Sequence, residues 1–263
     1  MLRTESLEHG VRQALLAGEA GEVPVVMSGD GLVGQVGGAL AETDAAMGII
    51  PGGRGNDLAR VLGIPADPAG AVGVLADGST RQIDVGVANG RRFLCVASCG
   101  FDSDANRIAN EARLVRGNLV YAYAAIRALI AWRPARFTVV LDGGEPIVFE
   151  GYSVAAGNSR AFGGGMFVAP HAELDDGEFD VITVSDVSKL RYVRGLPKAF
   201  KGTHIENEEV TERRAATVEI RADRDFAVYA DGEHLTDLPA TLGVLPRALR
   251  VIAPPGPFVG PPS

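Results

Sequence analysis

Two glycine-rich turns, each placed directly after a short apolar run, constrain the fold of this chain more than any other feature. The apolar runs cover about residues 23–27 and 46–50, and the turns that follow them cover 28–31 and 51–56. Such runs predict buried parallel strands, whose carboxyl ends meet at one edge of a sheet. Glycine lets the backbone come close to a ligand, and the amides at a helix start bind anions. We therefore predict a crevice that holds nucleotide phosphates.

The order of the expected elements divides the chain into two parts. Helices are predicted over about 5–18, 32–41, 56–62 and 68–76, and they alternate with the two strands. Beyond residue 78 strands dominate, at about 83–87, 93–96, 137–141, 147–156, 179–184, 215–221, 226–230 and 248–252. We predict an α/β nucleotide-binding domain over 1–84, an antiparallel β-sandwich domain over 85–252 and a disordered Pro/Gly tail over 253–263.

The charge and the cysteine content argue against several classes of protein. A formal charge of −8 and a pI near 5.1 argue against a nucleic-acid binder, because phosphate neutralisation needs a clustered basic face. The only two cysteines, Cys95 and Cys99, are expected to be buried reduced thiols rather than zinc ligands, which suits a cytosolic protein. No apolar run reaches about 18 residues, so no membrane span is predicted. The first twenty residues do not resemble a signal peptide.

Several acidic residues have two interpretations. Asp30 and Asp57 lie at expected helix starts, where each either caps a helix or binds Mg²⁺, orients a hydroxyl or accepts a proton. The acid-rich segment 169–180 is either a solvated turn or a source of oxygen ligands for Mg²⁺ or Ca²⁺. Asp231-Gly232-Glu233 on its own predicts only a hairpin turn. The four histidines show no metal-binding spacing, so a surface or local hydrogen-bonding role is expected for each.

A basic group surrounds a helical segment that is expected between the strands of the second part. Its apolar face is formed by Leu119, Tyr123, Ile126 and Ile130. The basic residues are Arg113, Arg116, Arg127, Arg133 and Arg136, and Trp132 lies among them. Contact with an anionic membrane surface is one interpretation, and an ordinary solvated face is the other.

Taken in order, five motifs resemble the diacylglycerol kinase catalytic-domain family, in which the bacterial lipid kinases match best and the sphingosine kinases are relatives. The motifs are Ser28-Gly29-Asp30-Gly31, the turn 51–57, the stretch 156–170, Asp175-Asp176-Gly177 and Asp231-Gly232-Glu233. The resemblance extends from about residue 4 to about residue 252. It implies a nucleotide domain and a β-sandwich with the active site between them, and the ATP-dependent phosphorylation of a lipid hydroxyl, with diacylglycerol converted to phosphatidic acid. It also implies a cytoplasmic protein that works at the inner face of the membrane.

The resemblance implies roles for individual residues. Glu233 would accept the proton of the lipid hydroxyl, assisted by Asp30 or Asp57 through Mg²⁺ and water. Asp176 would hold a structural Mg²⁺ together with carbonyl groups near Glu173 and Glu178. The residues implied to bind ATP are Thr4, Met27, Ser28, Gly29, Asp30, Gly31, Leu32, Gly53, Arg54, Gly55 and Asn56.

The chain departs from the family pattern in three places. Leu32 and Arg54 stand where the family usually has threonine or serine, and Arg54 would either pair with a phosphate or crowd the site. The family begins with a further strand, an Asn-Pro turn and a helix, and Thr4-Glu5-Ser6 is expected to be the end of its second strand. The sheet edge left exposed would favour non-native association of copies of the chain, and a homodimer is a separate expectation. A misassigned start and a truncated, inactive form are both consistent with this pattern.

Two other functions stay open on the sequence. NAD kinase shares the fold and the Gly-Asp-Gly loop, but it normally carries an Asn-Glu pair after the second strand, where this chain has Asn56-Asp57 within a glycine turn. The non-enzyme alternative is a lipid-binding or regulatory remnant without catalytic activity. The sequence does not identify the acceptor lipid.

Overall fold

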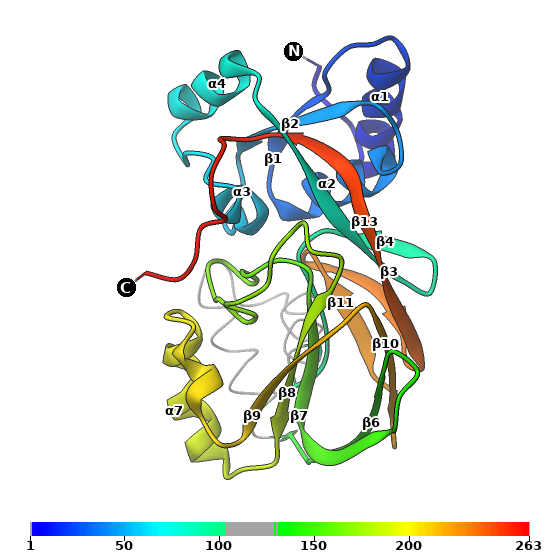
Figure 1. Cartoon of the computed structure of the whole chain (residues 1–263), viewed down its shortest axis with the longest axis vertical. Helices are drawn as coiled ribbons and strands as arrows, with labels where there is room; N and C mark the ends of the chain where they lie inside the picture. The colour runs from blue at the N-terminus through cyan, green and yellow to red at the C-terminus, as the bar shows by residue number, and fades with distance from the viewer. Residues whose placement is uncertain (1, 102, 104–128, 130, 263) are drawn as a thin grey trace.

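The computed structural model describes residues 2–101, 103, 129 and 131–262, and it shows a helix-rich α/β part joined to a strand-rich part (Figure 1). The first part contains α1 (Leu7–Glu19), β1 (Val25–Ser28), α2 (Asp30–Leu40), β2 (Ala46–Pro51), α3 (Asp57–Val61) and α4 (Pro68–Asp77). The four predicted helices and both predicted strands are therefore present. Residues 2–6 form no strand, so the expectation that Thr4-Glu5-Ser6 ends one is wrong. Ser6 instead caps α1, because its side chain accepts a hydrogen bond from the amide of His9.

The predicted parallel pairing of the first two strands is confirmed. In β1 and β2, Val26 lies opposite Ile49 and Ser28 lies opposite Pro51. Both glycine turns therefore begin at the same edge of the sheet. Helix α2, which follows the first turn, packs tightly against the core, since a Cβ on Gly37 would lie 2.6 Å from Leu94 Cδ1. The glycines that lower the helix propensity of α2 thus permit its close approach to the core.

The second part is antiparallel and sandwich-like, as predicted. Its elements are β3 (Thr80–Ala88), β4 (Arg91–Phe93), β5 (Val96–Gly100), β6 (Ala135–Leu141), β7 (Ile147–Gly157), β8 (Phe179–Ser185), α7 (Lys189–Ala199), a 3₁₀ turn (Thr203–Glu206), β9 (Val210–Ala215), β10 (Thr217–Ala222), β11 (Ala227–Ala230), β12 (Glu233–Asp237) and β13 (Ala240–Ile252). The strand predicted at 215–221 begins at Thr217, because Ala215 ends β9. Helix α7 and strand β9 were not predicted from the sequence, whereas the hairpin turn predicted at 231–233 joins β11 to β12.

Two long strands, β3 and β13, run through both parts of the molecule (Figure 1). Strand β13 pairs antiparallel with β10 near its start, and its residues Arg250 and Val251 pair parallel with β2. The proposed division at residue 84 therefore falls within β3, and the end of the chain completes the sheet of the first part. Each part keeps its own buried cluster, with Met47 and Ile49 in the first and Phe137 and Tyr152 in the second.

The prediction that residues 253–263 are disordered is wrong for the described residues of this segment. Phe258 is buried, and the guanidinium of Arg81 lies 3.7 Å from the centre of its ring. The amide of Val259 donates to the carbonyl of Val61 at 2.8 Å, and Arg160 donates to the carbonyl of Phe258 at 2.7 Å. One buried aromatic ring and these bonds hold a Pro/Gly-rich segment whose composition alone suggested disorder.

Other sequence expectations have mixed outcomes. Cys95 and Cys99 are free buried thiols, as predicted. The apolar helical face at 119–130 and the arginines at 113, 116 and 127 lie outside the described residues. Within the described residues, no helix has the length and apolar character that crossing a membrane requires.

Candidate active site

The two glycine turns touch each other through their backbones. A Cβ on Gly53 would lie 2.3 Å from the Cα of Gly29, so a larger residue at position 53 would force the turns apart. Asn56 shapes the second turn with a left-handed φ of 52°, and its side chain accepts from the amide of Gly53 at 2.8 Å and donates to the carbonyl of Gly53 at 3.0 Å. Asn56 therefore closes the turn on itself. The result is a narrow backbone cradle at the beginning of α2, whose first-turn amides have no intrahelical acceptor.

Asp30 and Asp57 join three segments around this cradle. Asp30 is the first residue of α2, and its Oδ1 accepts from the amide of Asp57 at 2.7 Å. The alternative that Asp30 caps its own helix is wrong, because the N-cap of α2 is Gly29 and Asp30 caps α3 instead. The carboxylate of Asp57 accepts from the amides of Gly164 at 2.9 Å and Gly165 at 2.7 Å. Asp57 thus ties the second turn to the loop at 163–165.

The environment of Asp57 indicates a positioning role rather than direct contact with a substrate. Its side chain is only 6% exposed, and both of its carboxylate oxygens accept hydrogen bonds. Burial raises the pKa of Asp57, and the hydrogen bond from Gly164 opposes this shift. Arg60 borders the same loop and donates to the carbonyl of Gly55 at 3.1 Å.

Glu233 reaches the cradle from the far end of the chain. The turn between β11 and β12 has left-handed backbones at Asp231 (φ 52°) and Gly232 (φ 85°). This turn brings Glu233 against the start of α2, since a Cβ on Gly31 would lie 3.4 Å from Glu233 Oε1. Glu233 is exposed on the surface of the cradle. The structure therefore places Glu233 and the Gly-Asp-Gly turn side by side.

Asp231 holds this turn in place, a role that the sequence did not indicate. Its Oδ2 accepts from the amide of Leu94 at 2.8 Å, and its Oδ1 accepts from the amide of Cys95 at 2.9 Å. Burial raises the pKa of Asp231 to about 6, although the two amides oppose the shift. A Cβ on Gly34 would lie 2.6 Å from Asp231 Oδ2, so α2 also packs directly on this carboxylate.

The remaining residues implied to bind ATP lie on different elements of the first part of the chain. Ser28 is the last residue of β1. In the second glycine turn the side chain of Arg54 is exposed, and Gly55 follows it. Leu32 points toward α1, because a Cβ on Gly10 would lie 2.9 Å from its Cδ1. Met27 is 53% exposed on the edge strand β1. Thr4 lies before α1, with its Cγ2 3.6 Å from the position of a Cβ on Gly10.

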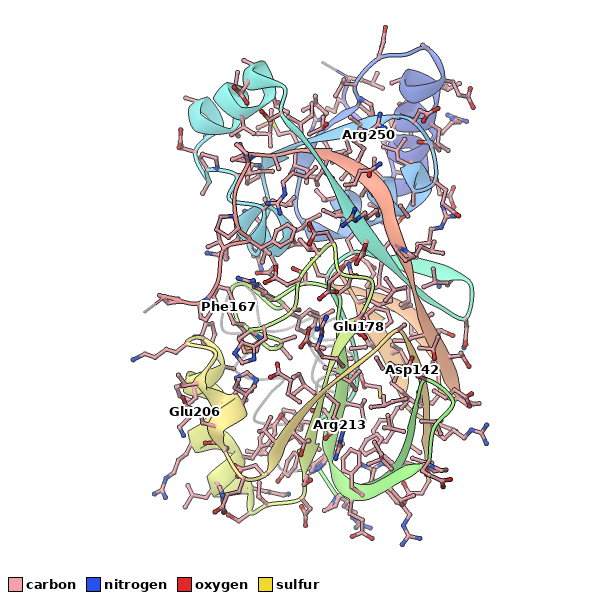
Figure 2. All side chains as sticks on the ribbon, in the orientation of Figure 1. Asp142, Phe167, Glu178, Glu206, Arg213 and Arg250 are labelled. Atoms are coloured by element: carbon pink, nitrogen blue, oxygen red, sulfur yellow. The ribbon has the colours of Figure 1, made fainter. Side chains whose placement is uncertain are left out.

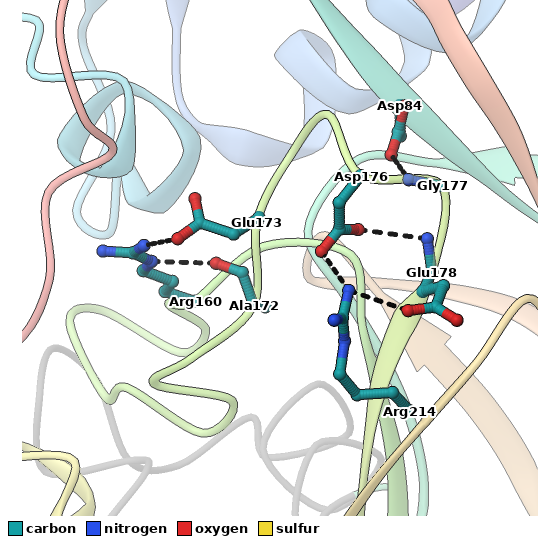
Figure 3. Close-up of polar contacts among 8 residues, drawn as sticks. All are labelled: Asp84, Arg160, Ala172, Glu173, Asp176, Gly177, Glu178 and Arg214. Carbon is teal, nitrogen blue, oxygen red and sulfur yellow. Dashed lines mark hydrogen bonds and ion pairs between the residues drawn. The ribbon is translucent and has the colours of Figure 1, made fainter.

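The acidic side chains of the expected Mg²⁺ loop form ion pairs with arginines in this structure. Glu173 pairs with Arg160, whereas Asp176 pairs with Arg214, which also contacts Glu178 at 2.8 Å (Figure 3). Among the described residues, no three His, Cys, Asp or Glu side chains are arranged to hold a metal ion. In the observed arrangement a guanidinium is the partner of the Asp176 carboxylate. The expected Mg²⁺ site, which combines this carboxylate with backbone carbonyls near Glu173 and Glu178, stays a prediction.

The loop that carries Asp176 and Gly177 is held in place by the buried carboxylate of Asp84 (Figure 3). Asp84 accepts from the amide of Gly177 at 2.7 Å and from the amide of Arg247 at 2.6 Å. Burial raises the pKa of Asp84, and the two amides oppose this effect. Neither Asp84 nor Arg214 was singled out from the sequence, because their partners lie far away along the chain.

The arrangement around Arg214 leads to a stability prediction. Arg214→Met leaves Asp176 and Glu178 close together without a cation. Because both carboxylates are partly exposed, we expect the free energy of unfolding to fall by about 1 kcal/mol or less. A chelator is expected to leave the melting temperature of the native protein unchanged, and Mg²⁺ is expected to raise that of the variant. Thermal scans with and without EDTA test both statements. A chelator-induced fall in the native protein would show that it holds a metal ion.

The four histidines make local contacts, as expected. His9 accepts from the amide of Glu5, His171 contacts Glu212, His204 contacts the carbonyl of Val168 and His234 contacts Asp237.

Comparison with known proteins identifies the family. Residues 2–88 match the diacylglycerol kinase catalytic domain, and residues 95–253 match the YegS C-terminal NAD kinase beta sandwich-like domain. The diacylglycerol kinase of Mycobacterium tuberculosis is 39% identical over 254 residues, which span 94% of this chain and 82% of that protein. The chain belongs to the diacylglycerol kinase family. Its similarity to lipid kinases thus covers both parts of the fold.

Further relatives agree with membership of the diacylglycerol kinase family. The diacylglycerol kinase of Bacillus subtilis is 29% identical over 254 residues, which cover 94% of this chain and 82% of the relative. The crystal structure of a diacylglycerol kinase from Bacillus anthracis superposes with a TM-score of 0.74 over 97% of this chain and 84% of that chain, at 22% identity. At this identity the superposition shows the shared fold.

Proposed function

We propose that this member of the diacylglycerol kinase family transfers the γ-phosphoryl group of ATP to the hydroxyl of diacylglycerol and so forms phosphatidic acid. The observation that carries the proposal is the position of the Glu233 carboxylate beside Gly31, at the first turn of α2. A carboxylate that can accept a proton therefore lies next to a backbone cradle suited to phosphates. Membership of the family supports a lipid kinase, and the geometry supports the roles of the residues.

In the proposed reaction, the lipid hydroxyl oxygen forms a bond to the γ-phosphorus while the bond to the leaving oxygen of ADP breaks. The hydroxyl proton passes to Glu233. The backbone of Gly29, Gly31 and Gly53 leaves room for the phosphates, because no Cβ fills the cradle. Asp30 and Asp57 hold the two turns and the loop at 163–165 in fixed positions relative to one another. An Mg²⁺ ion bound with ATP would screen the phosphate charge.

The lipid acceptor implies that the protein works at a membrane surface. We propose a cytoplasmic protein that associates peripherally with the inner face of the membrane. A homodimer is a further proposal, which the exposed apolar side chains of the edge strand β1, Val25 and Met27, support. Size-exclusion chromatography with light scattering tests the homodimer.

The assignment is tested with purified protein, radiolabelled ATP and Mg²⁺. One reaction contains dioleoylglycerol in detergent micelles, and a parallel reaction contains NAD as the acceptor. We expect labelled phosphatidic acid from the first and no labelled NADP from the second. Phosphorylation of NAD alone would replace the proposal with an NAD kinase activity, and no transfer to either acceptor would contradict the kinase activity of this chain.

A further inference from the structure

The lysines of this chain are confined to one short segment. The sequence contains 22 arginines distributed along its length but only three lysines, Lys189, Lys198 and Lys201, and all three fall on helix α7 or directly after it. Arg191 and Arg194 lie in the same segment, and no Asp or Glu occurs between residues 187 and 205. A protein with a formal charge of −8 therefore concentrates positive charge on one helix.

The outward face of α7 combines these cations with exposed apolar side chains. Tyr192 and Ala199 are buried, and the ring of Tyr192 stacks on Tyr152 with 4.0 Å between centroids, so the opposite face points outward. Leu190 is 61% exposed, Val193 is 40% exposed and Phe200 is 49% exposed. Arg194, Lys198 and Lys201 are exposed among them. Positions 190, 193, 194 and 198 recur at helical spacing and so share one face.

Ion pairs do not neutralise this face. Arg191 pairs with Glu208 and with Glu209, but in the described part of the chain Arg194, Lys198 and Lys201 have no carboxylate partner. Lys198 donates a hydrogen bond to the side chain of Asn207. The helix lies on the outer flank of the sandwich, away from β6 and β10, as Figure 1 shows. Three cations and three apolar side chains therefore face outward together.

Helix α7 is also connected to the active site. The carbonyl of Ala199 accepts from the amide of Phe167 at 2.8 Å, and Figure 2 shows Phe167 at the end of the helix. Phe167 is buried and lies two residues after the loop at 163–165, in which the amides of Gly164 and Gly165 bind Asp57. Any surface to which α7 binds would therefore lie close to the loop at 163–165, which borders the phosphate cradle.

We propose that α7 and the residues after it, 189–201, dock this kinase onto an anionic phospholipid bilayer. Amphipathic helices at membrane surfaces combine lysine and arginine with leucine and phenylalanine, and the long lysine stem lets its charge reach the lipid headgroups. Cores of protein–protein interfaces are depleted in lysine, which disfavours a protein partner for this face. The proposal rests on the proposed function, because a lipid acceptor must be reached in a bilayer.

Vesicle cosedimentation tests the docking surface. Native protein is compared with a triple variant, Arg194→Gln, Lys198→Gln and Lys201→Gln, on vesicles of phosphatidylcholine mixed with phosphatidylglycerol and on vesicles of phosphatidylcholine alone. Because each basic residue near an anionic surface contributes to binding, the triple variant is expected to bind the mixed vesicles on the order of a hundredfold more weakly. Added salt should weaken native binding as well. A second variant, Leu190→Ser with Phe200→Ser, is expected to reduce binding to the same vesicles.

A matched control changes the net charge equally elsewhere. Arg12→Gln, Arg91→Gln and Arg213→Gln replace exposed arginines on α1, β4 and β9, and this variant is expected to bind like native protein. Equal loss in the control, native-like binding by the α7 triple variant, or native binding without preference for anionic vesicles would each overturn the proposal.

Activity on diacylglycerol in detergent micelles separates this proposal from the proposed function. The α7 triple variant should keep native activity there, because no bilayer has to be reached. Absence of kinase activity in native protein, combined with vesicle binding that depends on α7, would contradict the proposed function and leave the docking surface supported.

Discussion

Glu233→Gln is expected to lower the kcat for lipid phosphorylation by about 10²- to 10⁴-fold, the range typical for loss of a general base. Glutamine has nearly the same shape but cannot take the hydroxyl proton. Glu233 is exposed at the start of β12, and the phosphate cradle is built from backbone on other segments. The KM for ATP and the melting temperature should therefore change little. Initial rates at varied ATP and lipid concentrations measure the effect.

The control for this variant is Glu145→Gln, which makes the same chemical change in the exposed turn between β6 and β7. Its rate should equal that of native protein. Full activity of Glu233→Gln would show that another group accepts the proton. A fall in melting temperature in Glu233→Gln would instead assign Glu233 a structural role.

Asp231→Ala is expected to have the largest effect on stability. The substitution leaves the buried amides of Leu94 and Cys95 without their acceptor, at about 1–3 kcal/mol for each unsatisfied group. We expect the free energy of unfolding to fall by about 3–5 kcal/mol and kcat to fall as well, because the turn that carries Glu233 loses its anchor. Urea unfolding measures the first effect. Asp231→Asn, which keeps one acceptor and tolerates the left-handed backbone, should lie between native protein and Asp231→Ala.

The cost of Asp231→Ala should depend on pH. Burial raises the pKa of Asp231 to about 6 in the folded protein, whereas an unfolded Asp has a pKa near 3.9, so the folded state binds the proton more tightly. The stability that this tighter binding contributes is full below about pH 4 and is lost as the pH rises through about 6. The difference between native protein and Asp231→Ala is therefore expected to be greater at pH 4 than at pH 7.5, by on the order of 2–3 kcal/mol. An equal difference at both pH values would show that Asp231 does not hold its proton more tightly in the folded state.

Local sequence patterns predicted much of the α/β part and less of the second part. The two glycine turns, their strands and the helices after them follow from apolar runs and from turn residues, which act over a few positions. Helix α7 was missed because its apolar residues are divided between a buried face at Tyr192 and an exposed face at Leu190 and Val193, which hides the usual single stripe. The prediction that the tail is disordered was wrong because the burial of one ring, Phe258, fixes the segment in spite of its proline and glycine content.

The charged residues show why the rest of the site could not be predicted. A carboxylate at 176 looks the same in sequence whether or not a guanidinium pairs with it, and this pairing depends on Arg214, which lies on β9. Asp231 likewise looks like an ordinary turn residue until the amides of Leu94 and Cys95 are placed against it. Electrostatic partners act through space, so their positions depend on how the strands pair.

The sequence by itself determined the two glycine turns, their place at the ends of parallel strands and the family to which the motifs belong, because these depend on neighbouring residues. The family resemblance implied that Glu233 and the Gly-Asp-Gly turn serve one site. Only the tertiary structure decided that Glu233 lies directly beside Gly31, that Asp57 holds the loop at 163–165 and that the cations of α7 face outward. Each of these results joins residues that the chain separates widely or selects one face of a helix. Strand pairing and core packing create such contacts, and no local pattern contains them.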